Sequence, residues 1–347
     1  MIYIRCDASE VIGWGHFKRC LILAKYLVKK TSVCFLMVQP DDAVKTLLLE
    51  ENIDLLELPS GLSFSQELSI YPQHVKNIIL DIGYRQTLNH PDEFNLYLKK
   101  LKCASIQTII IDGLDDDAFR HPEAPEVLAY IQPYWGVTET TSPHSKEWFY
   151  GAEYILIDDI YVMSYHKRHL NSLNNILITF GASDPQNNTA KVLRALSVMD
   201  IKQKLKVVIG PSFSETHINE IDEICEAHNI DKVLAPSNLL DQYKWADLAI
   251  CASSTSRYEA AACGLPVIFT AIYPQHVKLS KTYAQYGTSK YIGYCEDVLE
   301  TDWQTYIENF LANLSNYNSM INTLEQLKQK QSGAANLANA LLKILNL

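Results

Sequence analysis

Short apolar runs alternate with amphipathic stretches along the first third of the chain. The first run spans residues 2–7, and after it Phe17, Cys20, Ala24 and Leu27 recur at helical spacing. The predicted strands of this half are 2–7, 33–38, 53–58, 77–81 and 107–112, and the predicted helices include 41–51 and 91–102. Such alternation of strand and helix predicts a parallel sheet with helices on both faces.

The pattern restarts in the second half of the chain, after a less regular stretch from 113 to 170. Within that stretch, residues 154–157 predict one more strand. Residues 175–180 form an apolar run that leads into a predicted helix, with Asp184 as its cap and Pro185 at its first position. The further strands predicted in this half are 205–209, 231–235, 247–251 and 266–270.

The fold class predicted from these two series is α/β, with two Rossmann-like domains that face a cleft. The expected domains are residues 1–165 and 170–330, joined by a polar hinge at 165–172. The last predicted helix, 333–347, has an apolar side and is expected to pack back on the first domain. Ligands of such sheets bind outside the carboxyl ends of the strands, so the loops there should carry the chemistry.

Composition narrows the class of protein further. The 347 residues are 48% hydrophobic and 20% charged, which is typical of a globular protein. A net charge of −10 disfavours broad binding of nucleic acid, although a single nucleotide can still be held by a local site. No apolar run approaches the roughly 20 residues of a membrane span, and because the N-terminus enters the first strand directly, we expect no signal sequence. Eight cysteines without a Cys-x-x-Cys pair favour buried thiols in a reducing compartment over a zinc site, and we expect a cytoplasmic protein.

A histidine stands at the turn between the first strand and the first helix. Gly13, Trp14, Gly15 and His16 occupy this turn, where glycines allow close approach of the backbone to a ligand. The first amides of the helix favour phosphate or developing negative charge there, and His16 can exchange protons with the bound molecule. The alternative is a plain turn with an incidental histidine. Asp81 closes another predicted strand and could orient either a sugar hydroxyl or His16, or cap the next turn.

Three further segments fall at predicted strand ends. The segment 181–189 could dock an anion or a sugar hydroxyl, but capping of the following helix explains it equally well. Ser254, Thr255 and Ser256 open a predicted helix and suit a diphosphate, and Glu259 one turn later can accept from ribose hydroxyls. Either Gln275 or His276 could face the cleft from a fourth segment, with a surface loop as the alternative.

Taken in order, these segments resemble a known family of sugar-nucleotide enzymes. Residues 5–24, with Arg5, Asp7, the Gly-x-Gly-His turn and Arg19, resemble the first signature of the UDP-2,4-diacetamido-2,4,6-trideoxy-β-L-altropyranose hydrolases of the pseudaminic acid pathway. Residues 180–189 resemble the second signature of that family. Residues 254–259 with Gly264-Leu265-Pro266 resemble the nucleotide segment of the wider glycosyltransferase B (GT-B) superfamily, and the resemblance covers residues 1–290.

The resemblance implies a GT-B fold in which the second domain holds UDP and the sugar lies in the cleft. His16 matches the catalytic histidine of the family, and no metal or cofactor is implied. The chain departs from the family around the sugar, where Asp81-Ile82-Gly83-Tyr84 contains an extra residue. The substrate-binding residues expected on this basis are Arg5, Asp7, Gly13, Gly15, Arg19, Asp81, Tyr84, Gly181, Ser183, Asp184, Asn187, Ser254, Thr255, Ser256, Glu259 and Gln275.

The expected activity is therefore hydrolysis of a UDP-activated diacetamido-trideoxy sugar, with His16 as general base on water. One alternative is a GT-B glycosyltransferase, in which the same histidine deprotonates an acceptor hydroxyl. Another is a subunit that binds UDP without catalysis, and the presence of His16 weighs against it. The expected partner is a UDP-sugar, without nucleic acid or an integral membrane segment, and the pattern leaves the oligomeric state open.

Overall fold

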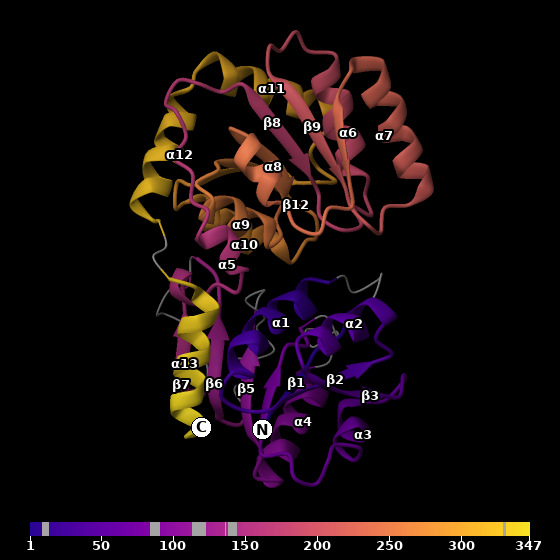
Figure 1. The fold of residues 1–347 in the computed structure, drawn as a ribbon, viewed down its shortest axis with the longest axis vertical. Coiled ribbons are helices and arrows are strands. Elements are labelled where there is room, and N and C mark those ends of the chain that lie inside the picture. The colour runs from indigo at the N-terminus through magenta and orange to yellow at the C-terminus, as the bar shows by residue number, and fades with distance from the viewer. Residues whose placement is uncertain (9–13, 84–90, 113–122, 136, 138–143, 329–330) are drawn as a thin grey trace. The chain divides into compact units, whose positions relative to one another are not determined.

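The chain divides into two compact units. A computed structural model describes residues 1–8, 14–83, 91–112, 123–135, 137, 144–328 and 331–347. Unit 1 comprises Met1–Ile157 with Gln331–Leu347, and unit 2 comprises Asp158–Lys330 (Figure 1). The stretch 165–172 lies within unit 2, where Arg168 donates hydrogen bonds to the carbonyl oxygens of Tyr243 and Lys244. The first crossing between the units is therefore earlier in the chain than the polar stretch suggested.

Unit 1 is built on a seven-stranded parallel sheet in the order β3-β2-β1-β4-β5-β6-β7. Its strands are β1 (Ile2–Arg5), β2 (Val33–Val38), β3 (Asp54–Leu58), β4 (Asn77–Leu80), β5 (Gln107–Ile111), β6 (Val127–Gln132) and β7 (Ser145–Tyr150). Its helices are α1 (Gly15–Leu27), α2 (Asp42–Glu50), α3 (Phe64–Leu68), α4 (Pro91–Cys103), the 3₁₀ helix η2 (Ala152–Tyr154) and α13 (Gly333–Leu345). Because β1 lies between β2 and β4, loops after these strands meet at one edge of the sheet.

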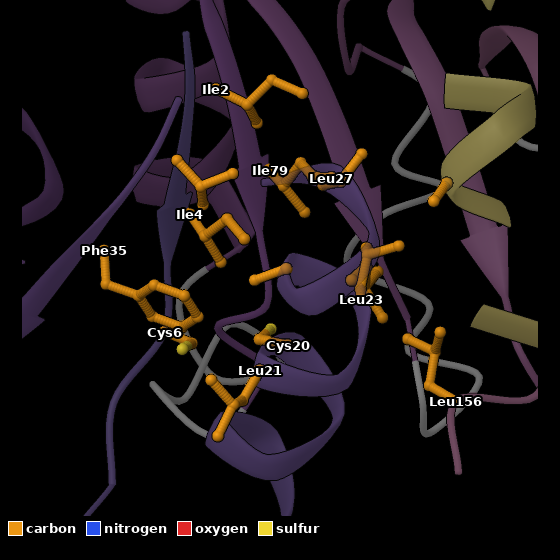
Figure 2. Close-up of a cluster of buried hydrophobic side chains, with 14 of the residues drawn as sticks. Ile2, Ile4, Cys6, Cys20, Leu21, Leu23, Leu27, Phe35, Ile79 and Leu156 are labelled. Atoms are coloured by element: carbon orange, nitrogen blue, oxygen red, sulfur yellow. The ribbon is translucent and has the colours of Figure 1, made fainter. Parts of the chain in front are cut away.

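The buried face of α1 anchors the first strand–helix turn of unit 1. Cys20, Leu23 and Leu27 of α1 belong to one apolar cluster with Ile4 and Ile79 of the sheet, as Figure 2 shows. The apolar side of α13 joins the same cluster, so the last helix of the chain packs beside the first. Burial of these side chains holds α1 firmly over the sheet, with its N-terminal residues at the carboxyl edge.

Unit 2 repeats the architecture with a six-stranded parallel sheet in the order β10-β9-β8-β11-β12-β13. Its strands are β8 (Asn175–Thr179), β9 (Lys204–Ile209), β10 (Asp231–Leu234), β11 (Leu248–Ala252), β12 (Val267–Ala271) and β13 (Ser289–Tyr294). Its helices are α5 (Asp159–Val162), α6 (Asn188–Ser197), α7 (Glu215–His228), α8 (Leu240–Trp245), α9 (Ser256–Ala262), α10 (His276–Ala284), α11 (Glu300–Ala312) and α12 (Ser315–Gln326). Within the described residues, no helix is both long enough and apolar enough to span a membrane.

Several elements differ from the sequence-based expectations. Residues 154–157 are not a strand: η2 ends at Tyr154, and the apolar residues after it are buried without pairing into a sheet. Leu156 instead fills the apolar cluster beneath α1 and α13. The helix predicted to begin at Pro185 with Asp184 as its cap begins three residues later. The structure has α6 starting at Asn188 with Asn187 as its N-cap, so Pro185 precedes the helix.

Candidate active site

His16 and Asp81 come together at the carboxyl edge of the unit 1 sheet. His16 is the second residue of α1, and Asp81 directly follows β4, the neighbour of β1 in the sheet. His16 Nδ1 lies 2.6 Å from Asp81 Oδ1. The side chain of Asp81 is fully buried, whereas that of His16 keeps 14% of its surface exposed. The pair therefore has a fixed, dry carboxylate behind a ring that solvent can still reach.

Hydrogen-bond donors from α1 surround the Asp81 carboxylate. Arg19 donates from Nε to Oδ2 and from Nη2 to Oδ1, and Cys20 Sγ donates to Oδ2 at 3.4 Å. These contacts, together with His16, engage both carboxylate oxygens. Of the alternatives that the sequence left for Asp81, these partners favour the orientation of His16.

The charges around His16 determine which form of the imidazole is present. An arginine can only donate and a carboxylate can only accept, so Nδ1 cannot bond to both Arg19 and Asp81. Because Asp81 is the nearer partner, we assign the proton to Nδ1, which leaves the lone pair on Nε2. Burial, aided by the charge of Arg19, lowers the pKa of His16 below its ordinary value, although Asp81 acts in the opposite direction. A neutral ring of this kind can accept a proton near neutral pH.

Asp81 is ionised in this environment. Burial alone would raise the pKa of Asp81, but the charge of Arg19 and the hydrogen bonds of Arg19 and His16 hold it well below its usual range. The reciprocal interaction raises the pKa of Arg19 despite the burial of its guanidinium. Orientation of a histidine by a buried carboxylate through Nδ1 is also the arrangement that activates the histidine base of serine proteases.

Arg5 and Asp7 lie in the interior of unit 1. Arg5 is fully buried, and its Nη1 atom donates to Asp7 Oδ1 at 2.6 Å while Nε and Nη2 donate to Glu67. Asp7 Oδ1 also accepts from the backbone amide of Val38 at 2.7 Å. Both residues were expected to contact substrate, whereas these partners tie β1 to α3 and to the end of β2. Sequence reasoning missed Glu67, which is 62 positions from Arg5 and carries no local signal.

The structure describes only one of the three remaining candidates of unit 1. Gly15 opens α1 and is exposed beside His16. Gly13 and Tyr84 fall outside the described residues. Asp112, at the end of β5, accepts a hydrogen bond from the hydroxyl of Tyr130 at 2.7 Å.

In unit 2, the serine-rich turn connects β11 to α9. Ser254 and Thr255 are half-buried at this turn, and the amide of Ser256, the first residue of α9, points to Ser254 Oγ at 3.4 Å. Glu259 lies one turn into α9, and its Oε2 atom accepts from the hydroxyl of the fully buried Tyr243 at 3.2 Å. The turn therefore gathers hydroxyls and a positioned carboxylate at the carboxyl edge of the second sheet.

His276 joins this turn from the neighbouring strand end. Its Nδ1 atom lies 3.0 Å from Ser253 Oγ, while Gln275, the residue before it, is exposed at the N-cap of α10. The structure thus brings the side chain of His276 to the turn. Ser253, the first of the hydroxyl residues in this segment, was not among the expected site residues.

The segment after β8 mainly organises the start of α6. Asp184 is buried, and its carboxylate accepts from the backbone amides of Asn188 at 3.0 Å and Thr189 at 2.7 Å. Asn187 Nδ2 donates to Glu220 at 2.6 Å. Gly181 and Ser183 are half-buried in the same turn. Although Asn187 is the N-cap residue, the carboxylate of Asp184 bonds to the first two amides of α6, which agrees with the capping interpretation.

Sequence comparison finds distant relatives. The chain is 28% identical over 282 residues to the uncharacterized protein MJ1062 of Methanocaldococcus jannaschii, which aligns with 77% of this chain and 54% of that protein. It thus spans about half the length of this relative. It is 26% identical over 295 residues to the spore coat polysaccharide biosynthesis protein SpsG of Bacillus subtilis, covering 84% of this chain and 83% of that protein. No family model matches the chain.

Solved structures share the whole architecture. MurG of Acinetobacter baumannii matches with a TM-score of 0.68 at 15% identity, over 99% of both chains. Alr3699/HepE of Anabaena, solved in complex with UDP and glucose, matches with a TM-score of 0.59 at 13% identity, also over 99% of both chains. Together with the two parallel sheets, these likenesses show that the chain has the GT-B fold.

Proposed function

We propose that this protein hydrolyses a UDP-activated diacetamido-trideoxy hexose to the free sugar and UDP, in the biosynthesis of a nonulosonic (pseudaminic-type) acid or a surface polysaccharide. The observation that carries the proposal is the contact of His16 with the buried Asp81 carboxylate. Support also comes from the signature at residues 5–24 and from the relative named for spore coat polysaccharide biosynthesis. The HepE structure, which holds UDP and glucose, supports a UDP-sugar as the ligand class.

In the proposed reaction, Nε2 of His16 takes one proton from a water molecule. The water oxygen bonds to the anomeric carbon while the bond from that carbon to the UDP oxygen breaks, and its electron pair leaves with UDP. The attack on the opposite face inverts the anomeric configuration. Asp81 holds the ring in place and stabilises the imidazolium that forms. Positioned general-base catalysis of this kind contributes roughly 10²–10⁴-fold to the rate.

Unit 2 is assigned the nucleotide part of the substrate. The hydroxyls at Ser254, Thr255 and Ser256 would donate to the diphosphate, and Glu259 would accept from the ribose hydroxyls. Donors placed before the reaction stabilise the negative charge that collects on departing UDP. No step of this scheme requires a metal ion.

The decisive experiment replaces His16 and follows UDP release without an acceptor. We expect His16→Asn to lower the turnover of a UDP-diacetamido sugar about 10²–10⁴-fold, with the fold intact by circular dichroism. His144→Asn is the matched control, because His144 is an exposed histidine of the same unit. In ¹⁸O-labelled water, the label should enter the sugar and not UDP. Near-normal turnover of folded His16→Asn protein would refute the proposed role.

The second candidate function is transfer of the sugar to an acceptor hydroxyl. It is favoured by the structural neighbours, among them a protein from Rickettsia africae solved as a glycosyltransferase, with a TM-score of 0.60 at 12% identity and coverage of 99% of this chain and 98% of that one. Release of UDP only when an alcohol acceptor is added, without ¹⁸O in the sugar product, would favour transfer over hydrolysis.

A further inference from the structure

The Asp81 carboxylate is shared between His16 and a cation from the same helix. Arg19 lies three residues after His16 on α1, and residues at this spacing occupy one helix face. Its Nε and Nη2 atoms contact the two oxygens of Asp81, and Nη2 also lies 2.9 Å from His16 Nδ1. Arg19 was expected to bind substrate, but these two nitrogens are committed to Asp81.

We propose that Arg19 is a positioning residue that keeps His16 neutral, and therefore able to accept a proton, by sharing the Asp81 carboxylate with the imidazole ring. The role of the neutral imidazole as a general base rests on the proposed function. The charge state of His16 is a property of the protein alone and can be measured without substrate.

The physical reason lies in the balance of charges around the ring. A buried carboxylate that faces only a histidine favours the imidazolium, because the two opposite charges stabilise each other. Arg19 opposes this effect in two ways: it neutralises Asp81, and it places a positive charge beside Nδ1. Burial of the ring disfavours the imidazolium as well, so both influences lower the pKa of His16.

Other titratable groups around this cluster do not replace Arg19. Asp7, which follows β1, raises the pKa of His16, but its carboxylate is paired with Arg5. Asp112, which follows β5, stabilises the charge of Arg19. Burial and contact with Cys6 raise the pKa of Cys20 well above its usual value, so this thiol acts as a neutral donor to Asp81.

The test follows the protonation of His16 by NMR titration of the substrate-free protein, with His16→Gln used to assign the signal. We expect Arg19→Met to move the titration midpoint of His16 upward by about one pH unit. Lys18→Met is the matched control, because it removes an exposed cation from the position of α1 before Arg19. In this variant the titration midpoint of His16 should stay at the wild-type value. Arg19→Lys keeps the charge and should retain most of the effect. An unchanged or lower midpoint in Arg19→Met would overturn the proposal.

A second pair of variants serves if Arg19→Met fails to fold around an unpaired carboxylate. In an Asp81→Asn background residue 81 carries no charge, so Arg19→Met leaves no unpaired buried carboxylate. We expect His16 to titrate at higher pH in Arg19→Met/Asp81→Asn than in Asp81→Asn alone, and coincident midpoints would refute a role for Arg19. Where the enzyme turns over a UDP-sugar, the acid limb of kcat/KM should shift in the same direction as the NMR midpoint. If no UDP-sugar is hydrolysed, the NMR result still decides the proposal on Arg19.

Discussion

Arg5 and Glu67 form a bidentate ion pair in the interior of unit 1. Arg5 Nε donates to Glu67 Oε2 at 2.9 Å, and Arg5 Nη2 donates to Glu67 Oε1 at 3.1 Å. Both side chains are 1% exposed. Since β1 precedes the turn that carries His16, this pair fixes the strand from which the proposed active site extends.

Breaking this pair should destabilise unit 1. Glu67→Gln removes one of the two carboxylates that bond to the buried guanidinium, while Asp7 remains as the other, so we expect a loss of about 1.5–3 kcal/mol, the range for hydrogen bonds to charged groups. The measurement is urea unfolding followed by circular dichroism. Glu57→Gln is the control, since Glu57 pairs with Lys45 on the surface, and it should leave the unfolding midpoint nearly unchanged. Equal midpoints for the two variants would contradict the structural role of Arg5.

The partner of Arg5 could not be predicted from the local sequence. Arg5 belongs to the segment that resembles the first signature of the hydrolase family, and the resemblance implied contact with substrate. The partner that engages it lies on α3, and only the tertiary fold brings the two together. The convergence of Arg19 and Cys20 on Asp81 likewise depends on the packing of α1 against β4. By contrast, the position of Asp81 after β4 follows directly from the apolar run before it, and that of His16 at the start of α1 follows from the helical spacing after it.

The strands show a similar division. Central strands such as β4 and β11 are buried on both faces and read as continuous apolar runs, which made them predictable. The edge strands β7 and β13, with exposed or half-exposed positions and mixed sequences, were not predicted, although the edge strands β3 and β10 were. The buried interior strand β6 was also missed, because it lies in the less regular stretch of the sequence. Residues 155–157 gave the opposite error, because burial without sheet pairing produces the same apolar signal as a strand.

Gly264 is expected to be indispensable at the turn between α9 and β12. Its φ is +73°, and a Cβ there would lie 2.6 Å from the carbonyl oxygen of His166 and 2.8 Å from the ring of Tyr165. We expect Gly264→Ala to lower the free energy of unfolding by about 2–5 kcal/mol, as the sum of left-handed strain and overpacking. Thermal unfolding measures this loss.

Gly287 provides the matched control for the substitution at Gly264. Its φ is +76°, but a Cβ there would meet only ordinary contacts with Thr323, the nearest at 3.5 Å. Gly287→Ala should therefore show the strain alone, about 1–2 kcal/mol. If both variants lose the same stability, the close approach of residues 165–166 contributes nothing to the need for glycine.

Tyr243 is expected to tune nucleotide affinity through Glu259. Its hydroxyl is shared between Glu259 Oε2 at 3.2 Å and the carbonyl oxygen of Ser256 at 3.3 Å, and the side chain is fully buried. Tyr243→Phe keeps the packing and removes the hydroxyl. We expect the Kd for UDP to rise about 5–10-fold by isothermal titration calorimetry, because a carboxylate that loses its donor is less well fixed.

Tyr317→Phe is the control for this experiment, since it removes a buried hydroxyl that bonds to Ser172 elsewhere in unit 2. It should bind UDP as the wild type does. Glu259→Gln should weaken binding at least as much as Tyr243→Phe. Wild-type affinity in Glu259→Gln would reject the assignment of the ribose to Glu259, and an effect of Glu259→Gln alone would reject the positioning role of Tyr243.

Activity and stability should both decline in acid, in the direction set by His16 and Asp81. His16, the proposed base, is active when deprotonated, and its pKa is lowered by burial and by Arg19. The acid limb of kcat/KM should therefore be centred below the ordinary histidine value of about 6.5. Between the folded and unfolded pKa values of His16 the unfolded chain binds more protons, so stability falls as the pH drops below the unfolded value. Asp81 has a lowered pKa in the folded state, and its contribution is lost as the pH falls through the carboxylate range.

The measurement is kcat/KM from about pH 5 to about pH 8, with circular dichroism at each pH to separate titration from unfolding. In Asp81→Asn the carboxylate that stabilises the imidazolium is absent, so any residual activity should extend to lower pH while its maximum falls. The fall should be large, on the order of 10²–10⁴-fold, because His16 loses the acceptor that fixes the proton on Nδ1. An acid limb centred above about 6.5 in folded wild-type protein would show that His16 titrates as a partner of Asp81 alone. That outcome would contradict the charge balance in which Arg19 takes part.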